Sequence, residues 1–278
     1  MTFINRSIAL FWLTSFSTYS WATSALTEPV SFTDVTNLKV KAPFAQVSYG
    51  SAPEQTLTRF RQSNGGEGTI LLFHGGCWSN AYGVDHALPM AQALAQLGYD
   101  VWAAEYRRVG DAGGGWPGTL TDVKRAIDYV SQNTGIAPLI IGHSAGGHLA
   151  LKASEDPNLN IRAVIALAPI IDLVTYGKEK GSCQSMVAKL MGDDAYRPDT
   201  RYQEASVARS RLRVPVKIII GSEDPIVSFE QVAPFAPSYV SIAAGAGHFD
   251  LIHPQTNAFS LITSTVEVLS SNARGSDR

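Results

Sequence analysis

The feature that most constrains the fold is residues 139–150, Leu-Ile-Ile-Gly-His-Ser-Ala-Gly-Gly-His-Leu-Ala. The apolar run Leu139–Ile141 is typical of the end of a buried strand, and apolar residues at helical spacing follow the glycines. Residues 142–146 fit the pattern G-x-S-x-G, in the strand–turn–helix context that this motif requires. The pattern predicts Ser144 as a nucleophile at the tip of a tight turn, where side chains at positions 142 and 146 would collide with neighbouring backbone. A serine that only caps a helix is the simpler alternative.

A second motif follows an earlier buried strand. The apolar run Thr69–Phe73 ends in His74-Gly75-Gly76-Cys77-Trp78. Two consecutive glycines let the backbone bend and present bare N–H groups, as in the strand-3 loop that builds half of an oxyanion hole in serine hydrolases. A plain turn is the alternative. We expect His74 to fix this loop through its ring nitrogens.

An acid and a base follow the last two predicted strands. The run Val216–Ile220 leads into Asp224, and Tyr239–Ile242 leads into a glycine-flanked His248. A serine hydroxyl needs a base within hydrogen-bond reach, and the base needs a carboxylate that holds its tautomer. The chain order serine, acid, histidine is the order of an α/β-hydrolase.

Other acids and histidines compete for these roles. Glu223 is the near rival of Asp224, Asp250 and Asp172 are weaker, and a turn-capping role for Asp224 is the structural alternative. We expect His143 and His148, which are local to the serine turn, to serve packing or hydrogen-bonded structure.

The chain resembles the α/β-hydrolase superfamily over nearly all of its expected mature length. The stretches 74–78 and 142–148 look like those of the esterase/arylformamidase and prolyl-oligopeptidase-like hydrolases. The resemblance implies Ser144 as nucleophile, Asp224 as acid and His248 as base. It implies oxyanion donors at the backbone N–H groups of Ala145 and Gly76, with Cys77 or Gly75 contributing. The chain departs from the formamidases in its predicted export signal and in Cys77, and from full prolyl-type peptidases in lacking a separate amino-terminal domain.

The predicted fold class is α/β: a mostly parallel central sheet with helices on both faces. Weak strand patterns at 38–40, 46–49 and 57–60 predict an antiparallel edge, and Thr119 with Asp122 resembles a capping box at the start of a helix. Residues from about 170 to 212 are too long for a simple crossover, so they predict a small cap insertion over the site.

The amino terminus predicts an export signal. Arg6, a short apolar core at 8–13 and small residues up to Ala22 form this pattern, so we expect a signal peptide at 1–22 and a hydrolase domain at 23–278. An uncleaved membrane anchor is the alternative. The expected location is periplasmic or secreted, with no stable membrane span after cleavage. A net charge of −2 provides no basic surface for nucleic acid.

The two cysteines, Cys77 and Cys183, are a candidate disulfide in an oxidising compartment, and two free thiols are the alternative. Such a bridge would tie the cap to the oxyanion loop. No metal site and no cofactor is predicted, because the histidine pairs 143/148 and 248/253 lack the H-E-x-x-H spacing.

Trp78, Tyr106 and Trp116 are candidate substrate-pocket residues, with burial in the core as the equal alternative. The predicted activity is hydrolysis of small-molecule carboxylic esters through an acyl-enzyme. The alternatives are an amide hydrolase with the same triad and a catalytically silent fold used for binding.

Overall fold

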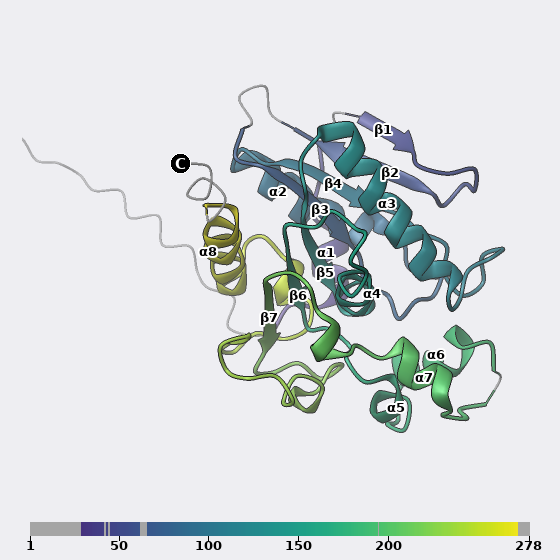
Figure 1. The fold of residues 1–278 in the computed structure, drawn as a ribbon. Helices are drawn as coiled ribbons and strands as arrows, with labels where there is room; N and C mark the ends of the chain where they lie inside the picture. The colour runs from purple at the N-terminus through teal and green to yellow at the C-terminus, as the bar shows by residue number, and fades with distance from the viewer. Residues whose placement is uncertain (1–28, 42, 44, 62–65, 194, 272–278) are drawn as a thin grey trace, which may run out of the picture.

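One eight-stranded sheet forms the centre of the molecule (Figure 1). The computed structural model describes residues 29–271 except 42, 44, 62–65 and 194. The strands are β1 (Ala45–Ser48), β2 (Thr56–Phe60), β3 (Thr69–Phe73), β4 (Asp100–Ala104), β5 (Leu139–His143), β6 (Ala163–Leu167), β7 (Val216–Gly221) and β8 (Val240–Ala243). Their order is β1-β2-β4-β3-β5-β6-β7-β8. The strands from β3 to β8 run parallel, while β2 is antiparallel to both of its neighbours. The predicted signal peptide lies outside the described residues.

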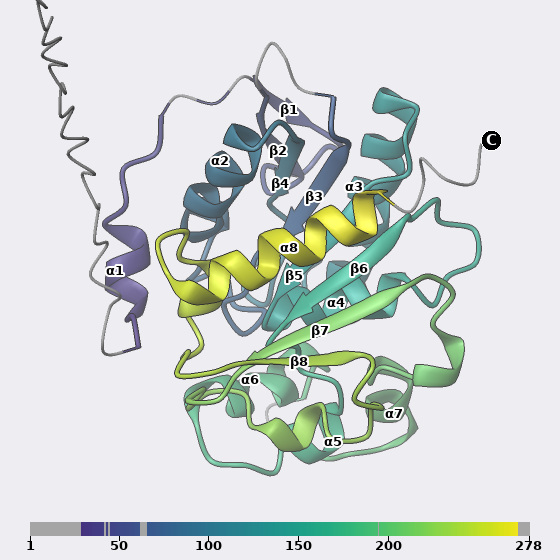
Figure 2. The ribbon, with the colours of Figure 1, turned by 90° about the vertical axis from the view of Figure 1, so that its left-hand side faces the viewer.

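The central strands are apolar along their whole length because both faces of the sheet are covered. Every residue of β3, β5 and β6 is buried. The longer helices are α2 (Leu88–Gln96), α3 (Gly118–Thr134), α4 (Ala145–Ala153) and α8 (Asn257–Ser271). Figures 1 and 2 show α2 and α8 on one face and α3 and α4 on the other. The predicted fold class is confirmed, and the arrangement is the α/β-hydrolase fold.

Three short helices form a group beyond the ends of the strands, at the bottom of Figure 2. They are α5 (Leu173–Tyr176), α6 (Ser182–Leu190) and α7 (Thr200–Ala205), and we refer to them as the cap. They lie in the segment 170–212, where the sequence predicts an insertion. Among the described residues, no helix has the length and apolarity that a membrane crossing requires.

The expected strand at 38–40 is wrong. The regular element in this part of the chain is instead α1 (Phe32–Thr36). Ser31 caps it, because its hydroxyl accepts the N–H of Asp34 while the Asp34 carboxylate accepts the N–H of Ser31.

The expected capping box at Thr119 is also wrong. α3 begins at Gly118, so Thr119 already lies inside the first turn and its hydroxyl donates to the carbonyl of Arg107. Asp122 is fully buried and binds the Arg107 guanidinium at 2.6 and 2.7 Å. Burial raises the pKa of Asp122, but the hydrogen bonds from Arg107 and Gln55 outweigh it and lower that pKa below its usual value.

The topology brings the loops that follow the parallel strands, including the His248 loop after β8, to one edge of the sheet. β3 lies between β4 and β5, so the direction in which strands are added reverses there. In such sheets the crevice at the carboxyl ends of the strands, beside this reversal, is the usual ligand site. The loops after β3, β5, β7 and β8 all begin at that edge.

Candidate active site

Ser144 occupies a strained turn between β5 and α4. Its backbone has φ 56° and ψ −119°, and its N–H donates to the carbonyl of Leu167 at 2.8 Å. A Cβ atom at Gly142 would lie 2.3 Å from the carbonyl oxygen of Gly146, and one at Gly146 would lie 2.2 Å from that of Phe73. The predicted steric need for both glycines is therefore confirmed. Strain of this kind, of order 1–3 kcal/mol, is typical of functional sites.

His248 is held by Asp224. Its Nδ1 lies 2.7 Å from Asp224 Oδ2, and both side chains are almost fully buried. The other carboxylate oxygen accepts the N–H groups of Ile226 at 2.8 Å and Val227 at 2.9 Å. Because a carboxylate only accepts, Nδ1 carries the hydrogen, and Nε2 of the neutral ring is left with a lone pair. That is the tautomer a general base needs.

The rival acids have other partners. Glu223 is exposed and accepts a hydrogen bond from the Ser222 hydroxyl. Asp172 caps α5 by accepting the N–H groups of Val174 and Thr175. Asp250 accepts backbone N–H groups of Val30 and Gly247. Of these four acids, Asp224 is therefore the one that the structure pairs with His248.

Ser144 and His248 line a common cavity of about 180 Å³. The other lining residues are Phe32, Gly76, Cys77, Tyr82, His86, His143, Ser182, Cys183, Ile226 and Phe249. Sequence reasoning missed its aromatic walls, Phe32, Tyr82 and Phe249. The position of Phe249 directly after the predicted base is the one signal that could have indicated it.

The loop after β3 presents a bent backbone to Ser144. Three consecutive residues have positive φ: Gly76 (99°), Cys77 (54°) and Trp78 (58°). Gly76 must be glycine, because a Cβ there would lie 2.4 Å from Cβ of Tyr82. A Cβ at Gly75 would lie 3.1 Å from Cβ of Ser144, so this loop packs directly on the serine.

Ala145 is the first residue of α4, and the first N–H groups of a helix have no acceptor within it. Of the four predicted oxyanion residues, Ala145 follows Ser144 directly, Gly75 packs on it, and Gly76 and Cys77 line the same cavity. Main-chain donors at such a position are suited to stabilise a developing oxyanion.

Cys77 and Cys183 form a disulfide in the structure, with their Cα atoms 5.0 Å apart. The bond joins the loop after β3 to α6 of the cap, and both cysteines line the cavity.

The pocket role predicted for three aromatic residues is not what the structure shows. Trp78, Tyr106 and Trp116 do not line the cavity, and the alternative of packing inside the protein holds. Trp78 and Tyr106 are fully buried. The Trp78 indole donates to His148 Nδ1 at 3.2 Å, and the Tyr106 hydroxyl donates to the carbonyl of His74 at 2.7 Å. Trp116 is half-buried, and its ring packs against His148. These three aromatic side chains therefore pack within the protein and not along this cavity.

His74 fixes its loop as predicted. Its Nδ1 lies 2.7 Å from the carbonyl of Gly75 and its Nε2 lies 2.8 Å from Glu105 Oε1. Glu105 also accepts from the Arg108 guanidinium at 2.9 Å and, through its other oxygen, from the N–H of Val84. Burial raises the pKa of Glu105, but the bonds from His74, Arg108 and Val84 lower it below its usual value.

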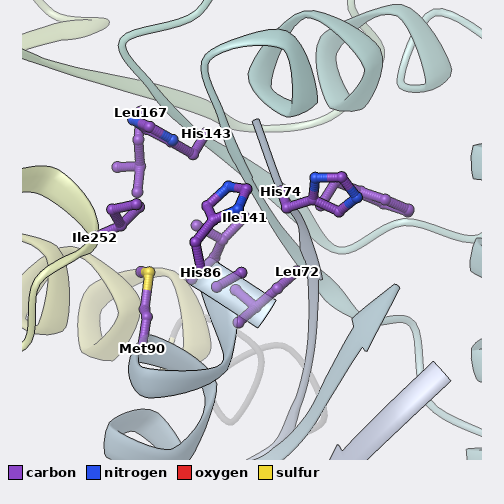
Figure 3. Close-up of a pocket in the computed structure, with 10 residues that line it drawn as sticks. Leu72, His74, His86, Met90, Ile141, His143, Leu167 and Ile252 are labelled. Carbon is purple, nitrogen blue, oxygen red and sulfur yellow. The ribbon is translucent and has the colours of Figure 1, made fainter. Parts of the chain in front are cut away.

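Three further buried histidines surround the site. Figure 3 shows His86 and His143 with His74 and several apolar side chains around a small void. The volume of this void is about 10 Å³. Burial lowers the pKa of His86 to about 3, that of His148 to about 4, and that of His143 well below 6.5. His148 Nε2 lies 2.8 Å from the carbonyl of Ala205 in α7, which links α4 to the cap. Among the described residues, no group of three His, Cys, Asp or Glu side chains is placed to hold a metal ion.

A family model matches residues 61–238, which is more than half of the sequence. The chain belongs to the BD-FAE family. This BD-FAE chain is 24% identical to the uncharacterised protein YfhR of Salmonella typhi over 182 residues, 62% of this chain and 60% of YfhR. It thus spans about 60% of the length of that curated relative.

Two other comparisons concern esterases. The BD-FAE chain is 37% identical to the "Probable carboxylic ester hydrolase LipM" of Mycobacterium tuberculosis over 95 residues, 32% of this chain and 22% of LipM. Esterase B of Lactobacillus Rhamnosis has the same fold, with a TM-score of 0.65 and 20% identity over 88% of this chain and 92% of esterase B.

Proposed function

We propose that this protein is a serine hydrolase that cleaves carboxylic esters through an acyl-enzyme. One observation carries the proposal: Ser144 and the Asp224-bound His248 line one cavity, beside the bent backbone of the loop after β3. The similarity to LipM over 95 residues supports the choice of esters.

In the first half of the proposed mechanism, Ser144 Oγ attacks the ester carbonyl and its proton passes to Nε2 of His248. Asp224 stabilises the resulting imidazolium. The carbonyl oxygen becomes an oxyanion that accepts hydrogen bonds from the N–H groups at 76, 77 and 145. When the intermediate collapses, the C–O bond to the alcohol breaks and His248 returns the proton to the leaving oxygen.

In the second half, His248 takes a proton from water as that water attacks the acyl-enzyme carbonyl. The same N–H groups bind the second oxyanion. Breaking the bond to Oγ releases the carboxylic acid, and the proton on His248 restores the Ser144 hydroxyl.

We propose export to a periplasmic or extracellular location, following cleavage after residue 22. The predicted signal lies outside the described residues. The disulfide between Cys77 and Cys183 supports the proposal, because structural disulfides persist mainly in oxidising compartments.

The test is hydrolysis of p-nitrophenyl esters from acetate to decanoate by the wild-type protein and by Ser144→Ala. We expect kcat to fall by about 10⁶-fold in the variant, because the remaining groups lack a nucleophile. In Asp224→Asn, kcat should fall by about 10⁴-fold, because an asparagine side chain does not hold His248 in the correct tautomer. Glu223→Gln is the matched control and should retain full activity, because its exposed carboxylate does not contact the site.

Three outcomes would contradict parts of the proposal. Activity on p-nitroanilides or N-formyl arylamines without activity on esters would assign amide chemistry to the same triad. No reaction with any substrate or with a serine-directed phosphonate would indicate a silent fold. An equal loss in Glu223→Gln and Asp224→Asn would overturn the choice of acid.

A further inference from the structure

A short segment near the amino terminus contacts the loop that carries His248. We name residues 29–36, which include α1, the strap. The N–H of Val30 donates to Asp250 Oδ2 at 3.0 Å, and the N–H of Gly247 donates to the same oxygen at 3.0 Å. A Cβ at Gly247 would lie 2.8 Å from Cβ of Pro29, so the two segments touch. One buried carboxylate therefore joins the strap to the loop of the proposed base.

The strap reaches the cavity through Phe32. This half-buried ring lines the cavity and contacts three other lining residues. Its centroid lies 5.6 Å from that of Tyr82, 5.4 Å from that of His86 and 5.4 Å from that of Phe249. Phe32 is therefore part of an aromatic wall whose members come from three distant parts of the chain.

The strap also has local features that hold Phe32 in place. Ser31 and Asp34 form the capping box of α1, and Val35 is fully buried. Figure 2 shows α1 in purple at the side of the molecule, beyond the end of α8. The capping box and the buried Val35 side chain fix α1 in position. Phe32 is therefore held at the cavity, because moving it would break these interactions.

We propose that the strap closes the substrate pocket and that Phe32 limits the size of the substrate group beside Ser144. The inference rests on the proposed function and adds a determinant of specificity to it. In a cavity of about 180 Å³, an aromatic ring on the wall excludes volume that a longer chain would need. One methylene in an apolar pocket changes kcat/KM by roughly 10-fold or more.

The experiment compares wild-type, Phe32→Ala, Phe32→Trp and Phe229→Ala proteins on two ester series. One series varies the acyl chain from acetate to decanoate on p-nitrophenol, and the other varies the alcohol on an acetyl group. Phe229→Ala is the matched control, because Phe229 is 53% exposed and does not line the cavity.

We expect Phe32→Ala to raise the ratio of kcat/KM for the longest to the shortest ester by at least about 10-fold in one series. The series in which this ratio changes shows whether Phe32 lies beside the acyl group or the alcohol group of the ester. Phe32→Trp should lower this ratio, and Phe229→Ala should leave it unchanged. Tm values close to wild type would show that the variants are folded.

A second measurement separates the two proposals. Rates of inactivation by p-nitrophenyl alkylphosphonates of graded length report the pocket beside Ser144 without turnover. Wild-type reactivity with unchanged length profiles in both Phe32 variants would overturn the strap assignment and leave the serine mechanism intact. A wild-type protein that is inert to all esters and phosphonates would overturn the proposed function, and the strap assignment with it.

Discussion

At the scale of single residues, His143 has an unusual combination of contacts. Its Nε2 lies 3.0 Å from the backbone carbonyl of His248, and the two rings lie 4.5 Å apart. Nδ1 is buried without a hydrogen-bond partner. Burial, and next the electrostatic interaction with the neighbouring His248 imidazole, lower the pKa of His143 well below 6.5. His143 therefore stays neutral and donates from Nε2 to the backbone carbonyl of His248. This bond holds the loop of the proposed base and places no positive charge beside the imidazolium that forms during the reaction.

His143→Phe should reduce kcat by roughly 100-fold, because small displacements of reacting groups have effects of that size. KM should change less than kcat, because the other residues that line the cavity are unaltered. His143→Gln keeps a donor at a similar reach and should recover most of the rate. The measurements are kcat and KM on p-nitrophenyl acetate, with Tm as the check on folding. Equal kcat in Phe and Gln variants would show that this hydrogen bond has no positioning role.

The residues of the proposed triad could be predicted from the sequence, whereas the cavity walls could not. Ser144 and His248 lie in glycine-flanked loops after apolar runs, so local sequence marks them. Phe32 reaches the cavity through contacts with residues 50 or more positions away, and no local pattern encodes such contacts. For Trp78 and Tyr106 the sequence leaves the cavity and the core as equal alternatives, and the structure shows their polar atoms hydrogen-bonded inside the core.

At the scale of elements, the disulfide constrains two parts of the chain that are 106 residues apart. The double variant Cys77→Ser/Cys183→Ser should lower the free energy of unfolding by about 2–5 kcal/mol, because the unfolded chain regains the freedom that the bond removes. Urea unfolding of oxidised wild type, reduced wild type and the double variant measures the loss. Identical midpoints for all three would contradict a stabilising role.

Strands were predicted to within one or two residues where their apolar runs are continuous. A strand covered on both faces is mostly apolar, so the apolar runs of β3, β5 and β7 are visible in the sequence even though Lys217 interrupts the run in β7. The helix α1 is too short to show helical periodicity, and its capping box at Ser31 was the available signal. The expected capping box at Thr119 is wrong because both side chains bind Arg107 instead: Asp122 accepts from its guanidinium, and the Thr119 hydroxyl donates to its backbone carbonyl.

At the scale of the whole molecule, buried neutral histidines make stability depend on pH. Burial lowers the pKa of His86 to about 3 and that of His148 to about 4. The ordinary value in an unfolded chain is about 6.5. Below pH 6.5 the unfolded chain therefore binds protons that the folded protein does not. The contribution of these two histidines to the free energy of unfolding is complete above pH 6.5 and is lost as the pH falls toward 3–4.

The urea concentration at the midpoint of unfolding should decrease as the pH is lowered from 7 to 5. It should stay nearly constant from pH 7.5 to pH 9. Each of these histidines contributes up to about 1.4 kcal/mol per pH unit below 6.5. His148→Gln removes one titrating group and should flatten the profile between pH 6.5 and 5. A midpoint that is equal at pH 7 and pH 5 would contradict neutral, buried histidines.

The order of the site residues along the chain also has a consequence for biosynthesis. The ribosome would synthesise the loop at 74–77 first, then Ser144, then Asp224, and His248 last of these. Domains fold as units during or after synthesis, so a nascent chain that stops before residue 248 has a serine without its base. Translation products that end before residue 248 would therefore be inert toward esters, and the proposed activity would require a chain made at least as far as His248.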